Sequence, residues 1–320
     1  MKKILAIALT VLMLVSLTAC GASKPADDGK YNIGIIQLVT HDALDAATNG
    51  FMDAVKAELG EENVTFDLQN AAGDSNTCST IVNAFVSNNV DLIMANATPA
   101  LQAASAATAD IPILGTSVTE YGVAMGIENF NGTVGGNVSG TSDLAPLDKQ
   151  ADMVQEWFPD AKNVGLLYCS AEPNSQYQVD TIQSLLEAKG YTCTKYAFAD
   201  SNDMAAVTQS AADASDVIYV PTDNAVASGT GVIDGICQAA GVPIIAGEEG
   251  ICAGCGVATL SISYYDLGVA TGKMAAKVLK GEADISTMPV EYAATSTPKY
   301  NAAICEALGL TAPEGYTAIG

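Results

Sequence analysis

The feature that most constrains the fold of this chain is an alternation of short apolar runs with helix-like segments, which occurs twice. The first run, at 31–37, is followed by apolar residues at helical spacing from Leu44 to Leu59. Further runs favour strands at 64–68, 91–95 and 112–116, with helices at 75–87 and 99–108 between them. Because these strands are apolar almost throughout, they predict parallel sheets that helices cover on both faces.

The same alternation restarts after a glycine-rich passage at 132–140. A helix at 147–157 precedes a second series, which predicts strands at 164–169, 192–197, 217–220, 243–246 and 256–262. The roughly 290 residues from 31 onwards also exceed what one hydrophobic core usually covers. The sequence therefore predicts an α/β fold with two doubly wound parallel-sheet lobes.

The N-terminus predicts export. Two lysines, Lys2 and Lys3, precede a run at 4–17 that is apolar apart from one Thr and one Ser. This run is shorter than the ~20 residues of a membrane-spanning helix and fits a secretory signal. It ends at 17–20 in a sequence that resembles a bacterial lipobox, so we expect a signal peptide at 1–20 and a lipid on Cys20. The alternative is a plain signal peptide that ends by chance in Cys. Residues 21–30 predict a flexible tether.

Charge and composition exclude several partners. The formal charge is −23, and loss of Lys2 and Lys3 with the signal peptide makes it −25, because residues 1–20 contain no Asp or Glu. Such a surface repels nucleic acid and anionic headgroups, so we expect no nucleic-acid partner and membrane contact only through the anchor. The sequence has no Arg and a single His, His41. Sites that bind phosphate or sulfate usually use Arg, so hydroxyls, backbone N–H groups or a Lys would hold any anionic group here.

Cofactor and enzyme motifs are missing from the sequence. The first strand-to-helix turn, at 37–43, has no glycine for a dinucleotide, and neither a P-loop nor a GxSxG sequence is present. Cys252 and Cys255 have CxxC spacing, but no second Cys or His pair accompanies them for zinc. We expect this pair in a glycine-rich turn and without redox function. The sequence therefore predicts no cofactor, no metal and no catalysis.

Polar groups follow the predicted strands and suggest a binding cleft. In open parallel sheets ligands bind beyond the carboxyl ends of the strands. The candidate residues at these ends are His41, Thr98 and Ser117 in the first series, and Glu172, Asn174, Ser175, Thr222, Asp223, Asn224 and Glu248 in the second. Helix capping explains several of them equally well, above all Thr98, Ser175 and Asp223. Both interpretations stay open for any single residue.

Several stretches resemble one family along almost the whole mature chain. They are found at 35–45, 97–100, 140–143, 172–175, 220–224 and 264–268. In these stretches the chain resembles the ABC-transporter substrate-binding lipoproteins of the tryptophan/tyrosine-uptake type. The resemblance implies a type I periplasmic-binding-protein fold with a three-crossing hinge, near 139–143, 260–263 and 285–290. Lobe one would comprise 31–141 plus 262–287, and lobe two 142–261 plus 288–320. It also adds Ser142 to the candidate ligand-binding residues.

The resemblance also implies a function. The protein would bind a small molecule, an aromatic amino acid such as tyrosine, tryptophan or phenylalanine, and deliver it to an ABC permease and its ATPase. It would be extracytoplasmic and lipid-anchored to the cell membrane. For an amino acid we expect the carboxylate at Thr98 and Ser117 and the ammonium at Asp223, with Tyr264 or Tyr265 as a wall. A surface adhesin or signalling receptor on the same fold is the alternative, and an enzyme is a third.

Overall fold

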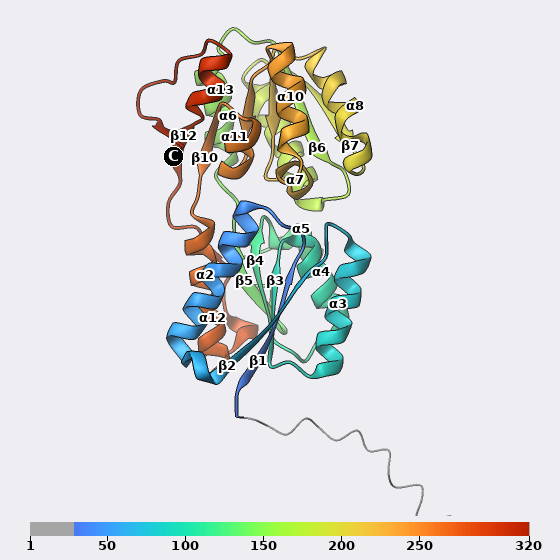
Figure 1. The fold of residues 1–320 in the computed structure, drawn as a ribbon, viewed down its shortest axis with the longest axis vertical. Coiled ribbons are helices and arrows are strands. Elements are labelled where there is room, and N and C mark those ends of the chain that lie inside the picture. Colours follow the sequence, from blue (N-terminus) through green and yellow to red (C-terminus); the bar gives the residue numbers. More distant parts are fainter. Residues whose placement is uncertain (1–28, 320) are drawn as a thin grey trace, which may run out of the picture. The chain divides into compact units, whose positions relative to one another are not determined.

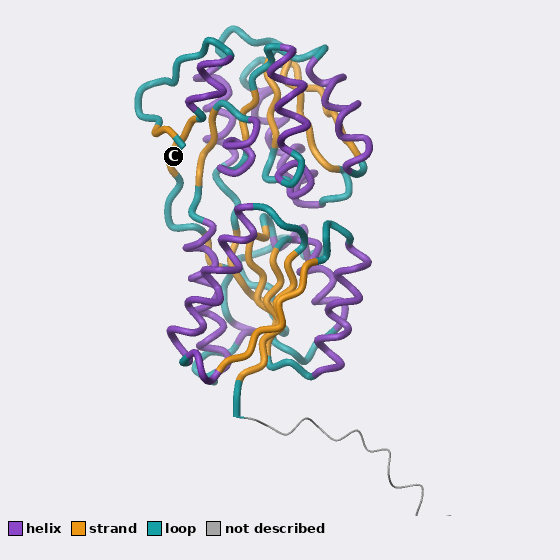
Figure 2. The backbone as a smooth tube through the Cα atoms, in the orientation of Figure 1, coloured by secondary structure: helices purple, strands orange, loops and turns teal. Residues whose placement is uncertain are grey.

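The structure, a computed structural model, describes residues 29–319. The predicted signal peptide, Cys20 and most of the predicted tether therefore lie outside the described residues. The chain divides into Met1–Lys30 and Tyr31–Gly320, and the second unit is described here. It contains two β-sheets, each lying between helices (Figures 1 and 2).

The first sheet has the strand order β11-β5-β4-β3-β1-β2, and all its neighbouring strands run parallel. Its strands are β1 (Tyr31–Gln37), β2 (Val64–Asn70), β3 (Leu92–Asn96), β4 (Ile113–Val118), β5 (Val138–Ser142) and β11 (Glu291–Tyr292). Two helices on one face lie side by side, α2 (Asp42–Leu59) and α12 (Tyr264–Leu279), as Figure 1 shows. Helices α3 (Ser75–Asn88) and α4 (Thr98–Ala107) cover the other face, and α5 (Tyr121–Met125) follows β4. We call this sheet with its helices the first lobe.

The second sheet has the order β13-β12-β10-β9-β8-β6-β7, with only the β10–β12 pair antiparallel. Its strands are β6 (Asn163–Cys169), β7 (Thr192–Phe198), β8 (Val217–Val220), β9 (Ile244–Ala246), β10 (Ala258–Ser261), β12 (Thr297–Tyr300) and β13 (Thr317–Ala318). One face packs on α6 (Leu147–Trp157), α7 (Pro173–Ala188) and α13 (Ala302–Ala307). The other packs on α8 (Ser201–Ala212), α10 (Thr230–Ala240) and α11 (Glu249–Cys255), and the short α9 (Asn224–Ala227) follows β8. This is the second lobe.

Burial on both faces explains why the strands are apolar throughout. In β6 the side chain of Leu166 packs toward α6 and α7, whereas the next residue, Leu167, packs toward α8 and α10. In β1 neighbouring residues Ile35 and Ile36 divide in the same way between the two faces of the first sheet. The predicted α/β fold with two doubly wound sheets is confirmed.

Three features of the fold differ from the sequence-based expectation. Strand β5 lies partly within the passage that we read as a glycine-rich connection. Strand β11 pairs with β5, so 291–292 belong to the first sheet and the last crossing follows Tyr292 instead of falling near 285–290. Two-residue strands carry no hydrophobic periodicity, which is why the sequence did not indicate this one. The other lobe boundaries stay a prediction. The third difference is that the CxxC pair lies in helix α11 and not in a turn.

Glycines bring α2 and α12 into backbone contact. A Cβ atom on Gly268 would lie 2.0 Å from the carbonyl oxygen of Ala47, and one on Gly50 would lie 2.1 Å from that of Tyr265. Any larger residue would therefore push the two helices apart. The contact holds the N-terminal half of α2 against that of α12, and His41 and Tyr264 stand where these two helices begin.

Candidate functional site

A cavity lies where the strand order of both sheets reverses. In the first sheet β1 lies between β2 and β3, and in the second sheet β6 lies between β7 and β8. The strand order therefore reverses between β1 and β3 and between β6 and β8. Ligands of doubly wound sheets bind outside the carboxyl ends of strands at this point. A cavity of about 210 Å³ is found there, lined mainly by small apolar side chains. Its lining includes Leu38, Val39 and Pro99 of the first lobe and Ala171, Glu172 and Ala225 of the second.

Buried polar atoms without a partner are found near the carboxyl ends of strands in both sheets. Within the described residues, the unpartnered atoms include Thr98 Oγ1, Ser117 Oγ, Asp143 Oδ1 and Asn174 Oδ1, and all four residues are buried. A buried polar atom that makes no hydrogen bond costs about 1–3 kcal/mol, so native proteins rarely keep one without a reason. Four such atoms near the strand ends make this place a candidate ligand site.

Strained backbone marks the same place. Ala97, which precedes Thr98, has φ = 91°, and Ser117 has φ = 53° within a β-bulge of strand β4. Non-glycine residues in this region cost about 1–3 kcal/mol each, and such strain clusters at ligand clamps. The strained residues therefore adjoin or carry two of the unpartnered hydroxyls, Thr98 at the start of α4 and Ser117 in β4.

Contacts connect three of the residues with unpartnered atoms, Ser117, Asp143 and Asn174. The hydroxyl of Tyr264 donates to Asp143 Oδ2 at 2.9 Å. The backbone N–H of Asp143 donates to the carbonyl of Val118, one residue after Ser117. Tyr264 also contacts the side chain of Thr222, whose carbonyl accepts from Asn174 Nδ2 at 3.2 Å. Residues of both lobes and of the crossing after β5 therefore face a common space.

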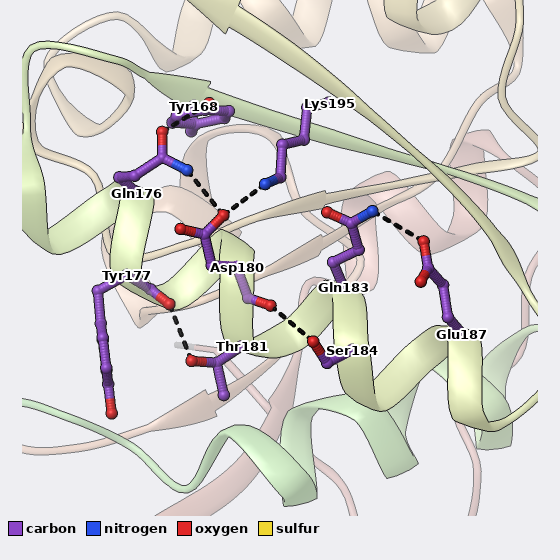
Figure 3. Close-up of polar contacts among 9 residues, drawn as sticks. All are labelled: Tyr168, Gln176, Tyr177, Asp180, Thr181, Gln183, Ser184, Glu187 and Lys195. Carbon is purple, nitrogen blue, oxygen red and sulfur yellow. Dashed lines mark hydrogen bonds and ion pairs between the residues drawn. The ribbon is translucent and has the colours of Figure 1, made fainter.

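Helix α7 carries Asn174 in its first turn. In the same helix, Gln176 accepts a hydrogen bond from the Tyr168 hydroxyl on β6 at 2.9 Å and donates to Asp180 at 2.8 Å (Figure 3). Asp180 also pairs with Lys195 on β7. These contacts tie the first two turns of α7, which include Asn174, to the sheet.

The site carries negative charge without a cation. Burial raises the pKa of Asp143 from its ordinary 3.8 to about 6, although hydrogen bonds from Tyr264 and Thr119 oppose the shift. Burial, with a contribution from Asp143, also raises the pKa of Glu248 to about 7. The ion pairs between described residues all join Lys to carboxylates outside this site. A positively charged group is therefore the partner that the site lacks.

Asp223, which we expected to face an ammonium group, caps a helix. Its Oδ1 accepts from the backbone N–H of Val226 at 2.9 Å, and its Oδ2 accepts from that of Cys169 at 2.7 Å. Glu172 is engaged in the same way, because Ala225 N–H donates to its Oε1 and Asn224 Nδ2 to its Oε2. Both carboxylates therefore already accept hydrogen bonds within their own lobe, whereas Asp143 keeps one oxygen without a partner.

Other predicted site residues also make contacts within the protein. Ser142 Oγ donates to the carbonyl of Thr119 at 2.8 Å and so stabilises the first crossing. Ser175 is fully buried at the start of α7. Glu248 caps α11 by accepting from two backbone N–H groups. His41 contacts Asn224 of the other lobe at 3.2 Å.

The two tyrosines proposed as walls differ from each other. Tyr264 is buried at the site, whereas Tyr265 is 43% exposed and donates to Asp53 on α2. Tyr265 therefore contacts the helix pair and does not line the site.

Asp143 is the residue that the sequence analysis did not include among the candidates. An acidic residue directly after a strand would have indicated it, but strand β5 begins within the glycine-rich passage and was not predicted.

The CxxC cysteines lie on helix α11, whose last residue is Cys255. Cys252 and Cys255 are buried, and burial raises the pKa of both thiols well above the ordinary value. A raised pKa keeps a thiol protonated, whereas nucleophiles and metal ligands need the thiolate.

Among residues 29–319 no group of three or more His, Cys, Asp or Glu is arranged to hold a metal ion. No described helix is both long and apolar enough to span a membrane.

Comparison with known proteins identifies relatives over nearly the whole described chain. Residues 32–318 match the family model described as ABC transporter substrate binding protein. A tyrosine-binding protein of Clostridioides difficile (strain R20291) is 37% identical over 302 residues, which are 90% of this chain and 87% of the relative.

Two solved structures match as well. An ABC domain from Streptococcus pneumoniae in complex with L-Trp has a TM-score of 0.86 and 33% identity, covering 91% of this chain and 100% of that one. A ligand-free, open structure of a Clostridium difficile substrate-binding protein with adhesive properties has a TM-score of 0.68 and 38% identity, covering 90% of this chain and 99% of that one.

Proposed function

This chain belongs to the family of ABC transporter substrate-binding proteins, and we propose that it binds an aromatic α-amino acid between its lobes and delivers it to an ABC permease. Substrate-binding proteins of ABC importers act outside the cytoplasm. What this member binds, and how it is held at the membrane, are the subjects of the proposal.

The observation that carries the proposal is the chemistry of the four unpartnered atoms. Two of them, on Thr98 and Ser117, belong to hydroxyls that can donate a hydrogen bond, and two, on Asp143 and Asn174, are acceptors. An α-amino acid presents a carboxylate that accepts and an ammonium that donates. We assign the carboxylate to Thr98 and Ser117 and the ammonium to Asp143 and Asn174. An arginine is not needed, because the hydroxyls are rigidly presented.

The apolar cavity supports an aromatic side chain. A ring that extends from the four atoms toward Pro99, Ala171 and Ala225 would lie at the switch point of both sheets. The tyrosine-binding and tryptophan-bound relatives agree with such a ligand. At similar sequence identity the chain superposes better on the tryptophan-bound structure than on the open one, which supports a lobe arrangement close to the ligand-bound form.

Binding then works by closure. The first lobe supplies the hydroxyls and the second lobe supplies Asn174, so a complete set of partners exists only when both lobes surround the ligand. A ligand that contacts both lobes shifts the open–closed equilibrium toward the closed form. The permease recognises that form and receives the ligand when the lobes open. We propose no chemical conversion of the ligand.

Mass spectrometry tests the ligand class. Protein purified from its producing cells and mildly denatured should release about one aromatic amino acid per chain. Ligand-stripped protein should then bind tyrosine, tryptophan or phenylalanine in titration calorimetry. Failure to bind any free amino acid would contradict the proposal.

We further propose that Cys20 carries the lipid anchor, on the basis of the sequence at 17–20. Replacement of Cys20 by Ala should move the protein from the membrane fraction to the medium or leave an unprocessed precursor. Unchanged fractionation and an unchanged mass would contradict this assignment.

The adhesive properties named for the Clostridium difficile structure favour adhesion as a second candidate function. Cells that lack this chain should then attach less well to host surfaces, and a variant unable to bind ligand should restore attachment. Normal attachment without the chain would exclude this function.

A further inference from the structure

His41 contacts the opposite lobe and not the ligand cavity. Its Nε2 atom lies 3.2 Å from Oδ1 of Asn224, although 182 residues separate them in sequence. It lines a second, polar cavity of about 360 Å³ together with Thr40, Ser228 and Glu248, and it is absent from the lining of the apolar cavity. The only imidazole of the chain therefore joins the lobes at one side of the proposed site.

The Asn224 side of this contact is fixed. Its Nδ2 donates to Glu172 Oε2 at 2.7 Å, and its backbone N–H donates to the same oxygen at 3.1 Å. Because the amide nitrogen is occupied, the carbonyl oxygen faces His41, so the imidazole must donate through Nε2–H. Burial lowers the pKa of His41, which favours the neutral ring.

The backbone of His41 is fixed as well. His41 is the N-cap residue of α2, and the backbone of α2 contacts that of α12 at Gly50 and Gly268. Donor and acceptor are thus held by different lobes, each within a rigid frame. A hydrogen bond between two such groups forms only when the lobes approach each other.

We propose that His41 is a positioning residue that latches the closed form: its hydrogen bond to Asn224 slows release of the ligand without touching it. This inference rests on the proposed function in so far as the ligand is enclosed between the lobes. A typical net hydrogen-bond contribution corresponds to a roughly two- to tenfold change in dissociation rate. Since the bond is absent in the open form, the association rate should not change.

Three variants test the latch by stopped-flow measurement with L-tyrosine and L-tryptophan. His41→Ala should release ligand roughly two- to tenfold faster with an unchanged association rate. His41→Gln keeps an N–H donor that can reach Asn224 and should stay within about twofold of the unaltered protein. Asp42→Asn, a matched control next in sequence, should also release ligand at the unaltered rate. Equal dissociation rates for all three variants would overturn the latch, as would His41→Gln behaving like His41→Ala.

A second readout separates this inference from the proposed ligand. If neither amino acid binds the unaltered protein, the proposed function fails, and small-angle scattering of the ligand-free proteins then decides on the latch. His41→Ala should populate more open, larger particles than the unaltered protein, and His41→Gln should not. Identical scattering curves in that case would overturn the latch.

Discussion

Replacement of Asp143 by Asn should make the protein more stable and nearly unable to bind its ligand. The pKa of Asp143 rises from 3.8 to about 6 because the carboxyl is buried, so keeping it ionised at neutral pH costs about 3 kcal/mol. Asn has the same shape and can still accept from the Tyr264 hydroxyl, which lies 2.9 Å from the carboxylate. The substitution therefore removes the buried negative charge with little change in the size of the side chain.

Both effects have an expected magnitude. The ligand-free variant should gain about 1–3 kcal/mol of stability, and each kcal/mol raises Tm by about 2–4 °C in domains of comparable or somewhat smaller size. A bound ammonium group would lose its anionic partner, and breaking a buried ion pair costs about 3–5 kcal/mol. Affinity should therefore fall at least about 100-fold.

Thermal melts of ligand-free protein and titration calorimetry at pH 7.5 measure the two quantities. Asp223→Asn is the matched control, because Asp223 is also buried but accepts from backbone N–H groups of its own lobe. Its affinity should stay within a few-fold of the unaltered protein. A destabilised Asp143→Asn variant that binds ligand normally would refute the reasoning, since Asp143 would then be only a structural contact of the crossing.

Three further predictions concern pH, packing and the cysteines. Burial raises the folded-state pKa of Asp143 to about 6 and of Glu248 to about 7. Both carboxyl groups therefore add most to the free energy of unfolding of the ligand-free protein below about pH 4. This contribution is lost as the pH rises through 6–7. Urea unfolding should accordingly show higher stability at pH 5 than at pH 7.5, and the opposite order would contradict the two shifts. Gly268→Ala should cost about 1–3 kcal/mol, because its Cβ would lie 2.0 Å from a backbone oxygen of α2, and an unchanged Tm would show that the helices can separate freely. Replacing Cys252 and Cys255 together by Ser should leave ligand affinity within a few-fold in the folded protein, whereas complete loss of binding would assign the pair a function.

The architecture could be predicted because buried parallel strands have a strong sequence signal. Strands such as β1 and β6 are apolar on both faces, and the helices between them have a clear period. Strands β11 and β13 have two residues each, and their backbone pairing leaves no pattern in the sequence. Strand β5 begins within a glycine-rich passage, which obscured it.

The candidate site could be predicted only in part. The sequence indicated the strand ends, and the unpartnered atoms of Thr98, Ser117 and Asn174 are found there. It could not distinguish a ligand contact from a helix cap, because that difference depends on which hydrogen bonds are already made. Asp223 has both oxygens occupied, whereas Asp143 has one oxygen free. Only three-dimensional contacts separate these two aspartates.

The central claim is that this site binds a zwitterion, and one calorimetric comparison tests it most directly. Ligand-stripped protein is titrated with L-tyrosine, with tyramine, which lacks the carboxylate, and with 3-(4-hydroxyphenyl)propionate, which lacks the ammonium. The pairing of Thr98 and Ser117 with the carboxylate, and of Asp143 and Asn174 with the ammonium, predicts tight binding of L-tyrosine alone. Each analogue leaves buried partners unpaired and should bind at least about 100-fold more weakly. Binding of either analogue as tightly as L-tyrosine would contradict the account.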